Sequence, residues 1–205
     1  MKPLNKRLAR HTELYFSVDI EADGPIPGPY SMSSLGACVA GEGDGKRFRR
    51  LDPESSTFYR ELKPISDDFV PEAARVSGLD RKKLIRNGDD PSEAMRNFDE
   101  WVTSVARGRQ PVFVAWPLGF DWMWVYWYLR KFHTSSPFGH SSCLDMKTIY
   151  HRLRNTTLEG TSKSRLPEDL RSTREHTHNA LDDAMEQADL FANMLMRDPR
   201  VTIIK

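Results

Sequence analysis

Cysteine is scarce in this chain of 205 residues. Its two cysteines, Cys38 and Cys143, lie in apolar stretches without the C-x-x-C spacing of a zinc site, which predicts buried thiols in a reducing compartment. The chain also lacks an apolar run of the ~20 residues that a membrane span needs, and its first residues lack the apolar segment of a secretory signal. We therefore expect a soluble, cytoplasmic protein that has no membrane partner.

An excess of charge of either sign is absent too. The 30 Lys and Arg residues nearly balance the 29 Asp and Glu residues and leave a formal net charge of +1. The overall charge therefore does not indicate a nucleic-acid-binding protein, and such a role has to come from local clusters of charge. The length fits one domain. We expect a basic N-terminal arm at residues 1–13, a single domain at residues 14–197 and a C-terminal tail at residues 198–205.

The order of predicted strands and helices indicates an α/β fold. We expect three strands, two helices, and then two further strands that alternate with helices. The strands are expected at residues 14–20, 32–40, 57–62, 111–116 and 143–148. The helices are expected at residues 71–76, 90–107, 120–132, 149–154 and 179–197. Short connections between the first three strands predict an antiparallel meander, and a strand that follows a crossover helix pairs in parallel. Asp90, Pro91 and Glu93 are typical of a helix start.

The segment from Phe120 to Phe132 is aromatic on every side and is expected to be helical. Such a helix buries more than one face, as it does when it packs between a sheet and a neighbouring element. A wall on which bases stack and a contact in a dimer are the alternatives.

Asp19 and Glu21 end the first strand. Side chains alternate along a strand, so both carboxylates point to the same face. No basic residue lies between Leu14 and Gly24 to neutralise them. Hard oxygen ligands of this kind suit Mg²⁺ or Mn²⁺. The alternative is that both acids are solvent-facing residues of an edge strand.

Two further segments supply acids. Asp121 directly follows a buried strand, at the carboxyl end where sites collect in α/β sheets. His178 precedes the last helix and Asp183 lies one turn inside it, so both side chains can point at one site. The alternative for this segment is that His178 is a capping histidine and Asp183 an exposed acid. Four acids and one histidine from three segments predict a two-metal site in which the histidine takes a proton from the attacking water.

Three motifs then resemble those of the DEDDh 3′-5′ exonucleases, the group that includes the proofreading subunit of bacterial DNA polymerase III, ribonuclease T and oligoribonuclease. They are Val18–Gly24, Phe120-Asp121 and His178–Ala184, and residues 70–79 resemble the stretch between the first two motifs. The resemblance implies a ribonuclease H-like mixed sheet, with a three-strand antiparallel meander plus two parallel strands, flanked by helices.

The resemblance also implies roles for the site residues. Asp19, Glu21 and Asp183 would hold the first of two Mg²⁺ ions, for which Mn²⁺ can substitute. Asp19 would bridge to the second ion, Asp121 would act near that ion through water, and His178 would be the general base. The chain departs from the family at Trp116-Pro117-Leu118, where many members have His-Asn-Ala, and its loop at residues 25–29 is stiffened by three prolines.

The implied activity is metal-dependent removal of nucleoside 5′-monophosphates from the 3′ end of a single strand. RNA is favoured over DNA because nothing after the last helix looks like a tether to a polymerase. The alternatives are a DNA exonuclease for proofreading or repair, an enzyme that cleaves nucleotide esters or dinucleotides, and a catalytically silent nucleic-acid-binding module on the same fold. The resemblance also makes a homodimer possible, with the aromatic helix as material for an interface, although the same helix fits the core of a monomer.

Substrate contacts are expected from the end of the first motif, from aromatic residues near Asp121 and from a polar loop before the last helix. The residues are Ala22, Asp23, Gly24, Trp116, Phe120, Trp122, Lys163, Arg165, Arg171 and Arg174. The alternative for the four basic residues is that they are solvated loop charges without a function.

Overall fold

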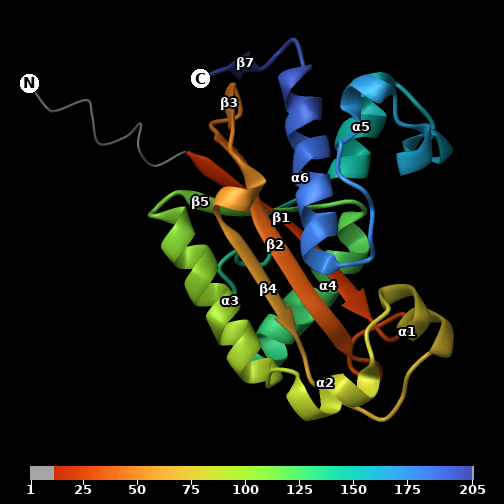
Figure 1. The fold of residues 1–205 in the computed structure, drawn as a ribbon. Helices are drawn as coiled ribbons and strands as arrows, with labels where there is room; N and C mark the ends of the chain where they lie inside the picture. Colours follow the sequence, from red (N-terminus) through yellow and green to blue (C-terminus); the bar gives the residue numbers. More distant parts are fainter. Residues whose placement is uncertain (1–11, 205) are drawn as a thin grey trace, which may run out of the picture.

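A mixed β-sheet runs through the centre of the molecule, for which the computed structural model describes residues 12–204 (Figure 1). Its strands are ordered β6-β5-β1-β2-β3-β7, and β4 also pairs with β2. The strands are β1 (Glu13–Ala22), β2 (Met32–Gly43), β3 (Arg47–Arg50), β4 (Thr57–Glu61), β5 (Gln110–Ala115), β6 (Cys143–Asp145) and β7 (Thr202–Ile203). β1 and β2 are the longest of them and form the middle of the sheet.

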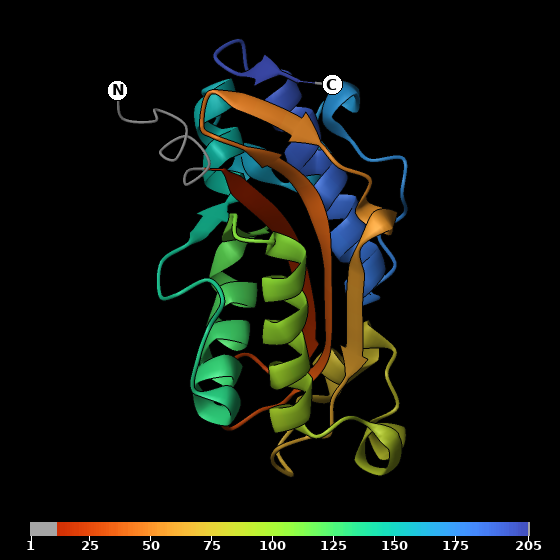
Figure 2. The same ribbon diagram turned by 90° about the vertical axis from the view of Figure 1, so that its left-hand side faces the viewer.

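Helices cover both faces of this sheet (Figure 2). The pair α3 and α4 packs on one face, α5 and α6 pack on the other, and α1 and α2 lie near the end of the sheet at which β1 finishes (Figure 1). The helices are α1 (Pro71–Ser77), α2 (Arg81–Asn87), α3 (Pro91–Ala106), α4 (Leu118–Tyr128), α5 (Met146–Arg154) and α6 (Ala180–Met196). Within the described residues, no helix has the length and apolar character needed to cross a bilayer.

The side chains of β1 divide between the two helical layers. Leu14, Phe16 and Val18 are fully buried in the core beneath α3 and α4. Tyr15 belongs to the core beneath α5 and α6, and by alternation Asp19 and Glu21 point to that same side. The strand therefore supplies both layers of core and directs its two acids toward α6.

The predicted α/β architecture is confirmed. β1 pairs antiparallel with β2, β2 pairs antiparallel with β4, and β5 and β6 continue the sheet in parallel from β1. The predicted start of α3 is also confirmed, because the Asp90 carboxylate accepts hydrogen bonds from the N–H groups of Ser92 and Glu93, at 2.8 and 3.4 Å. The cap fixes the end of a helix that places Met95 and Phe98 in the core.

Three short elements differ from the sequence prediction. β3 lies in the polar stretch expected to be a turn and insertion, where only Phe48 is buried. β7 forms in the expected C-terminal tail and pairs in parallel with β3. α2 has no apolar periodicity, and its start is set by Asp80, whose side chain accepts from the N–H groups of Lys82 and Lys83. Elements of this kind escape the sequence patterns because they bury too few side chains to create a periodic signal.

Two other boundaries also change. The strand expected at residues 143–148 ends at Asp145, because the Asp145 side chain accepts from the Thr148 N–H and begins α5 there. Most of the expected N-terminal arm lies outside the described residues, and Glu13 already belongs to β1.

The thiol of Cys38 is buried as predicted, whereas that of Cys143 is only half-buried.

The aromatic helix α4 is mainly a core element, as predicted. Trp124, Val125 and Tyr128 are fully buried, and the chain continues into a π-helical turn at Leu129–His133. The Tyr128 hydroxyl accepts a hydrogen bond of 2.7 Å from the Met32 N–H at the start of β2. This bond ties α4 to the strand next to β1.

Gly36 lets α6 approach the sheet unusually closely. It lies in β2 directly opposite Asp19, and a Cβ atom at this position would overlap the backbone of Ala180 and Leu181 at the start of α6. A glycine inside a strand is typical of such a backbone approach. The absence of this one side chain brings the first turn of α6, with Asp183, next to Asp19.

We predict that Gly36→Ala destabilises the protein by about 2 kcal/mol or more, because α6 has to move away from β2. A loss of that size lowers the thermal midpoint by roughly 4–8 °C. Gly119→Ala is the matched control, because open space surrounds its added methyl group and alanine is the better helix former. Thermal denaturation of both variants tests the packing, and equal stability of Gly36→Ala and the wild type would contradict it.

Candidate functional site

Three carboxylates from two distant segments meet at the end of β1. Oxygen atoms of Asp19, Glu21 and Asp183 all lie within 4.8 Å of one another. β1 supplies the first two and the first turn of α6 supplies the third. Asp183 is almost completely buried, at 1% exposure, so its charge is poorly screened by solvent.

The crowding changes the acidity of these groups. Burial raises the pKa of Asp19 well above its ordinary value, and the neighbouring charges of Asp121 and Asp183 raise it further. Burial, followed by the charges of Asp183 and Asp121, raises the pKa of Glu21 to about 7. Like charges held this close disfavour one another's ionised form. The cluster is therefore an electrostatically unfavourable arrangement unless positive charge is added.

Asp121 reaches the same region from the first turn of α4. Its side chain is buried, and its Oδ1 accepts a hydrogen bond of 3.1 Å from the Ile20 N–H, between the two acids of β1. Burial raises the pKa of Asp121 to about 7. The predicted grouping of four acids is thus present in the structure, with Asp121 held beside the other three by the backbone of β1.

The start of α4 has its own support. The peptide bond between Trp116 and Pro117 is cis, and the Leu118 N–H donates to Asp145 Oδ1 at 3.0 Å. Asp145 also accepts from the Thr148 N–H. One carboxylate therefore joins the starts of α4 and α5 in the region where the chain departs from the family motif.

The segment before α6 is pinned to Asp183. The N–H groups of Thr177 and His178 donate to the two oxygens of this carboxylate, at 2.9 and 3.1 Å. His178 is exposed and has a left-handed backbone, with φ of 57°. Nitrogen atoms of the His176 and His178 rings lie within 4.8 Å of one another and of Asp183. The predicted histidine is thus beside the acids and accessible to solvent.

Gln187 is a site residue that the sequence reasoning missed. Its side-chain N–H donates to Asp19 Oδ1 at 2.5 Å, and its carbonyl oxygen accepts from the Trp116 N–H at 2.8 Å. Gln187 therefore fixes the orientation of Asp19 and ties α6 to the end of β5. Its position four residues after Asp183, on the same side of the helix, is the signal that could have identified it.

The donor atoms of this cluster fit a hard divalent cation. Asp19, Glu21 and Asp183 offer only carboxylate oxygens, and neither cysteine belongs to the group. Oxygen ligands of this kind are preferred by Mg²⁺, Mn²⁺ and Ca²⁺ over softer metals. The raised carboxyl pKa values show the same need for positive charge.

The residues after Glu21 mainly support the loop. The Asp23 carboxylate accepts from the Ser31 N–H at 2.6 Å and is paired with Arg81 of α2, while Gly24 packs against the ring of Tyr30. Ala22 is buried at the end of β1. The side chains of Ala22 and Asp23 are thus engaged by the protein and Gly24 has none, so the expected contribution of these residues to substrate binding would have to come from backbone groups.

The aromatic candidates differ sharply in exposure. Trp116 is buried against Tyr150, with ring centroids 5.9 Å apart, and has no free face on which a base can stack. Trp122 is half-buried and packs on Phe113 and Tyr126. Phe120 is 38% exposed in the first turn of α4. We therefore correct the expectation for Trp116, and Phe120 is the candidate best placed to meet a base.

The basic candidates also separate. Arg165 pairs with Glu159, Arg171 donates to the carbonyl oxygens of Leu166 and Ser164, and Arg174 pairs with Glu54 and Asp189. Lys163 instead pairs with Glu186 of α6, one turn beyond Asp183, at 2.7 Å. Burial raises the pKa of Asp121, and the ammonium of Lys163 opposes that effect. Of the four basic residues, Lys163 is therefore the one that pairs with an acid in the turn of α6 that follows Asp183.

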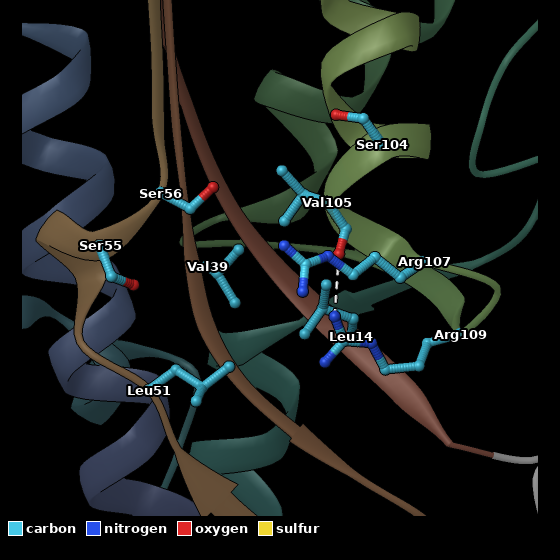
Figure 3. A pocket seen from close by; sticks show the side chains of 9 residues that line it. All are labelled: Leu14, Val39, Leu51, Ser55, Ser56, Ser104, Val105, Arg107 and Arg109. Atoms are coloured by element: carbon cyan, nitrogen blue, oxygen red, sulfur yellow. Dashed lines mark hydrogen bonds between the residues drawn. The ribbon is translucent and has the colours of Figure 1, made fainter.

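A surface pocket lies elsewhere in the molecule, away from the four site carboxylates (Figure 3). It encloses about 410 Å³ beside Leu14, at the opposite end of β1 from Glu21, with Val39 and Leu51 on its floor. Arg107 points over this floor, while Arg109 is fixed by a hydrogen bond of 2.8 Å to the Val105 carbonyl oxygen. The chemistry of the carboxylates therefore does not depend on this cavity.

Known proteins are similar to this chain in sequence and in fold. Residues 15–195 match the family described as the 3′-5′ exoribonuclease Rv2179c-like domain. A curated relative, the 3′-5′ DNA exonuclease Cap18 of Escherichia coli, is 39% identical over 180 residues, which are 87% of this chain and 90% of the relative. Both descriptions name a 3′-5′ exonuclease, although they differ in the nucleic acid.

Solved structures show the same architecture at low identity. The nuclease domain of 3′hExo, described as a DEDDh family member bound to rAMP, has a TM-score of 0.70 at 13% identity and aligns over 96% of this chain and 97% of that domain. Exonuclease I has a TM-score of 0.67 at 15% identity, over 92% of this chain and 42% of that protein. Pop2p of S. pombe, described as bound to Mg²⁺ and Mn²⁺, has a TM-score of 0.60 at 18% identity, over 89% and 83%.

The fold is thus ribonuclease H-like, as the motifs implied. The family match covers the three acidic segments and every helix that positions them. The chain belongs to the Rv2179c-like family of 3′-5′ exoribonuclease domains.

Proposed function

We propose that this protein is a metal-dependent 3′-5′ exonuclease that releases nucleoside 5′-monophosphates from single-stranded nucleic acid. The observation that carries the proposal is the convergence of Asp19, Glu21 and Asp183 within 4.8 Å. Carboxylates that repel one another this strongly are stabilised by cations, and a phosphodiester needs the same cations to offset its own charge. The 3′-5′ exonuclease activity of the described relatives supports the assignment.

In the proposed site, Asp19, Glu21 and Asp183 would hold one Mg²⁺ ion, and Asp19, with Asp121 acting through water, would serve a second. When bound, the two ions supply positive charge to the oxygens around the phosphorus atom. Gln187 keeps Asp19 in the required orientation through its hydrogen bond to Oδ1. Mn²⁺ is expected to replace Mg²⁺, because both favour carboxylate oxygens.

His178 is proposed as the general base. A ring nitrogen accepts a proton from the attacking water, whose oxygen forms a new bond to phosphorus while the bond from phosphorus to the 3′ oxygen of the preceding nucleotide breaks. That 3′ oxygen takes a proton from solvent, so the products are a nucleoside 5′-monophosphate and a shortened strand. The accessible ring of His178, beside the buried Asp183, suits exchange of this proton with solvent.

The type of nucleic acid is the finer part of the proposal. The family description names an exoribonuclease and the Cap18 description names a DNA exonuclease. We propose RNA as the preferred substrate and DNA as the alternative, and the decision depends on contacts to the 2′-hydroxyl group. A homodimer and a cytoplasmic location stay predictions from the sequence.

A catalytically silent binding module is the main competing function. All four acids and the histidine of the motifs are present in the sequence, and the proximity of Asp183 to Asp19 and Glu21 on one side and to His178 on the other supports a joint role. A module that only bound nucleic acid would gain nothing from acids that repel phosphate. The crowded carboxylates therefore favour an enzyme.

We predict that Asp183→Asn abolishes stepwise shortening of a 5′-labelled single strand in Mg²⁺. His178→Ala should slow it by about 10²–10⁴-fold, the usual contribution of a general base. His151→Ala, on the exposed side of α5, is the control and should leave the rate unchanged. Gel electrophoresis of time courses measures the three rates. Unimpaired shortening by Asp183→Asn would exclude the proposed site.

We predict that Glu21→Gln stabilises the metal-free protein at pH 8, because it removes one of the repelling charges. The gain should be roughly 1 kcal/mol once solvent screening is included, or about 2–4 °C in thermal midpoint. Added Mg²⁺ should raise the midpoint of the wild type more than that of the variant. Glu100→Gln on the exposed side of α3 is the control. A lower midpoint for Glu21→Gln in EDTA would show that the carboxylates do not repel as described.

We predict faster shortening of RNA than of DNA of the same sequence. A chimeric strand tests the cause, because a single 3′-terminal ribonucleotide on DNA should restore most of the RNA rate if the site reads the terminal 2′-hydroxyl. Rates at equal concentrations of the three oligonucleotides are compared. Faster shortening of all-DNA strands would replace RNA with DNA as the preferred substrate.

A further inference from the structure

Glu186 connects the polar loop to the acidic site. It lies three residues after Asp183 in α6, and its Oε2 atom is 2.7 Å from Lys163 Nζ and 3.2 Å from His176 Nδ1. His176 Nδ1 is also 3.1 Å from Asp183 Oδ1. A single carboxylate thus holds two side chains of the segment before α6 beside a proposed metal ligand.

Lys163 has spare capacity to bind an anion. Its ammonium carries three N–H donors, and among residues 12–204 Glu186 is the one side chain with which it forms an ion pair. Its side chain is 26% exposed, whereas that of Glu186 is 12% exposed. Glu186 is therefore largely buried, whereas the Lys163 ammonium keeps access to solvent and to a ligand.

The charge of Lys163 acts on two of the acids in the proposed site. Burial raises the pKa of Asp19, and the ammonium of Lys163 acts in the opposite direction on it, as it does on Asp121. Lys163 is also linked to Asp183 by contacts, because its partner Glu186 lies 3.2 Å from His176 Nδ1, which lies 3.1 Å from Asp183 Oδ1. Arg165 and Arg174 are instead paired with acids of other segments, Glu159 and Glu54.

A site built from carboxylates repels the phosphate that it has to bind. Oxygens of Asp19, Glu21 and Asp183 lie within 4.8 Å of one another, and Asp121 is bonded to the Ile20 N–H between the first two. The ammonium of a lysine beside these acids offsets part of this repulsion, and as a side chain it is always present. An ammonium held by a nearby carboxylate is already oriented before the substrate arrives, which avoids part of the entropic cost of ordering it.

We propose that Lys163 donates a hydrogen bond to a non-bridging oxygen of the scissile phosphodiester, and that Glu186 is the positioning residue that holds Lys163 there. The inference rests on the proposed exonuclease function. It assigns Lys163 to the terminal phosphodiester itself and not to general attraction along the strand. It also gives Glu186 a role that does not require contact with the substrate.

His176 is a second partner of Glu186 and has to be separated from this effect. Its ring packs edge-to-face on that of His178, with centroids 4.6 Å apart. Loss of Glu186 therefore disturbs His176 as well as Lys163. If Glu186 acts through Lys163, the double variant Lys163→Met/Glu186→Gln binds substrate no more weakly than Lys163→Met alone.

The test measures binding of a fluorescent single-stranded oligonucleotide by anisotropy in EDTA, over a series of salt concentrations. We expect Lys163→Met to weaken binding about 10-fold, as for a hydrogen bond to a charged group, and to reduce the slope of log K against log salt by about 0.7. Lys163→Arg should recover most of the affinity, and Glu186→Gln should weaken binding less than Lys163→Met. Lys131→Met, an exposed lysine beyond α4, is the matched control and should change neither quantity.

An oligonucleotide whose 3′-terminal linkage is a methylphosphonate locates the contact. This linkage lacks the charged oxygen, so the wild type should bind it as weakly as Lys163→Met binds the natural strand, and Lys163→Met should lose nothing further. An equal loss for the variant on both oligonucleotides would overturn the proposal, as would unchanged binding by Lys163→Met. Failure of the exonuclease proposal is a different result, in which the wild type does not shorten any strand in Mg²⁺ or Mn²⁺.

Discussion

The close approach of α6 to β2 is the contact on which the site depends. Gly36 has no side chain, so the backbone at Ala180 packs directly on the sheet opposite Asp19. This contact places the buried Asp183 beside the two acids of β1, where burial and then the charge of Asp183 raise the pKa of Glu21. The packing energy of a large core therefore maintains an arrangement of charges that is unfavourable by itself.

The elements around the carboxylates have complementary tasks. Ile20 donates its N–H to Asp121, Gln187 donates to Asp19, and Thr177 and His178 donate to Asp183. Asp121, Asp19 and Asp183 are thus each oriented by hydrogen bonds from a different part of the chain. Orientation of ligands by such neighbouring groups is a general feature of metal sites. Glu186 extends the same principle from the acids to a cation, Lys163.

The sequence predicted the strongly patterned parts of this molecule. β1, β5, α3 and α6 have apolar periodicity or a capping signal, and the acids lie at the ends of these elements. β3 and β7 have neither, and α2 has a cap at Asp80 but no apolar periodicity, so all three were missed. The partners of the acids were also missed, because the pairing of Gln187 with Asp19 or Lys163 with Glu186 depends on distances between segments that no local pattern encodes. The burial of Trp116 is another property of the packed structure alone.

The central claim is that the three converging carboxylates bind divalent cations for phosphodiester hydrolysis. Anomalous diffraction from crystals soaked with Mn²⁺ and a nucleoside 5′-monophosphate tests it most directly. The account predicts manganese peaks within bonding distance of Asp19, Glu21 and Asp183, with the nucleotide phosphate beside them. Saturating Mn²⁺ that leaves these three carboxylates without a peak, or a nucleotide bound elsewhere, would contradict it.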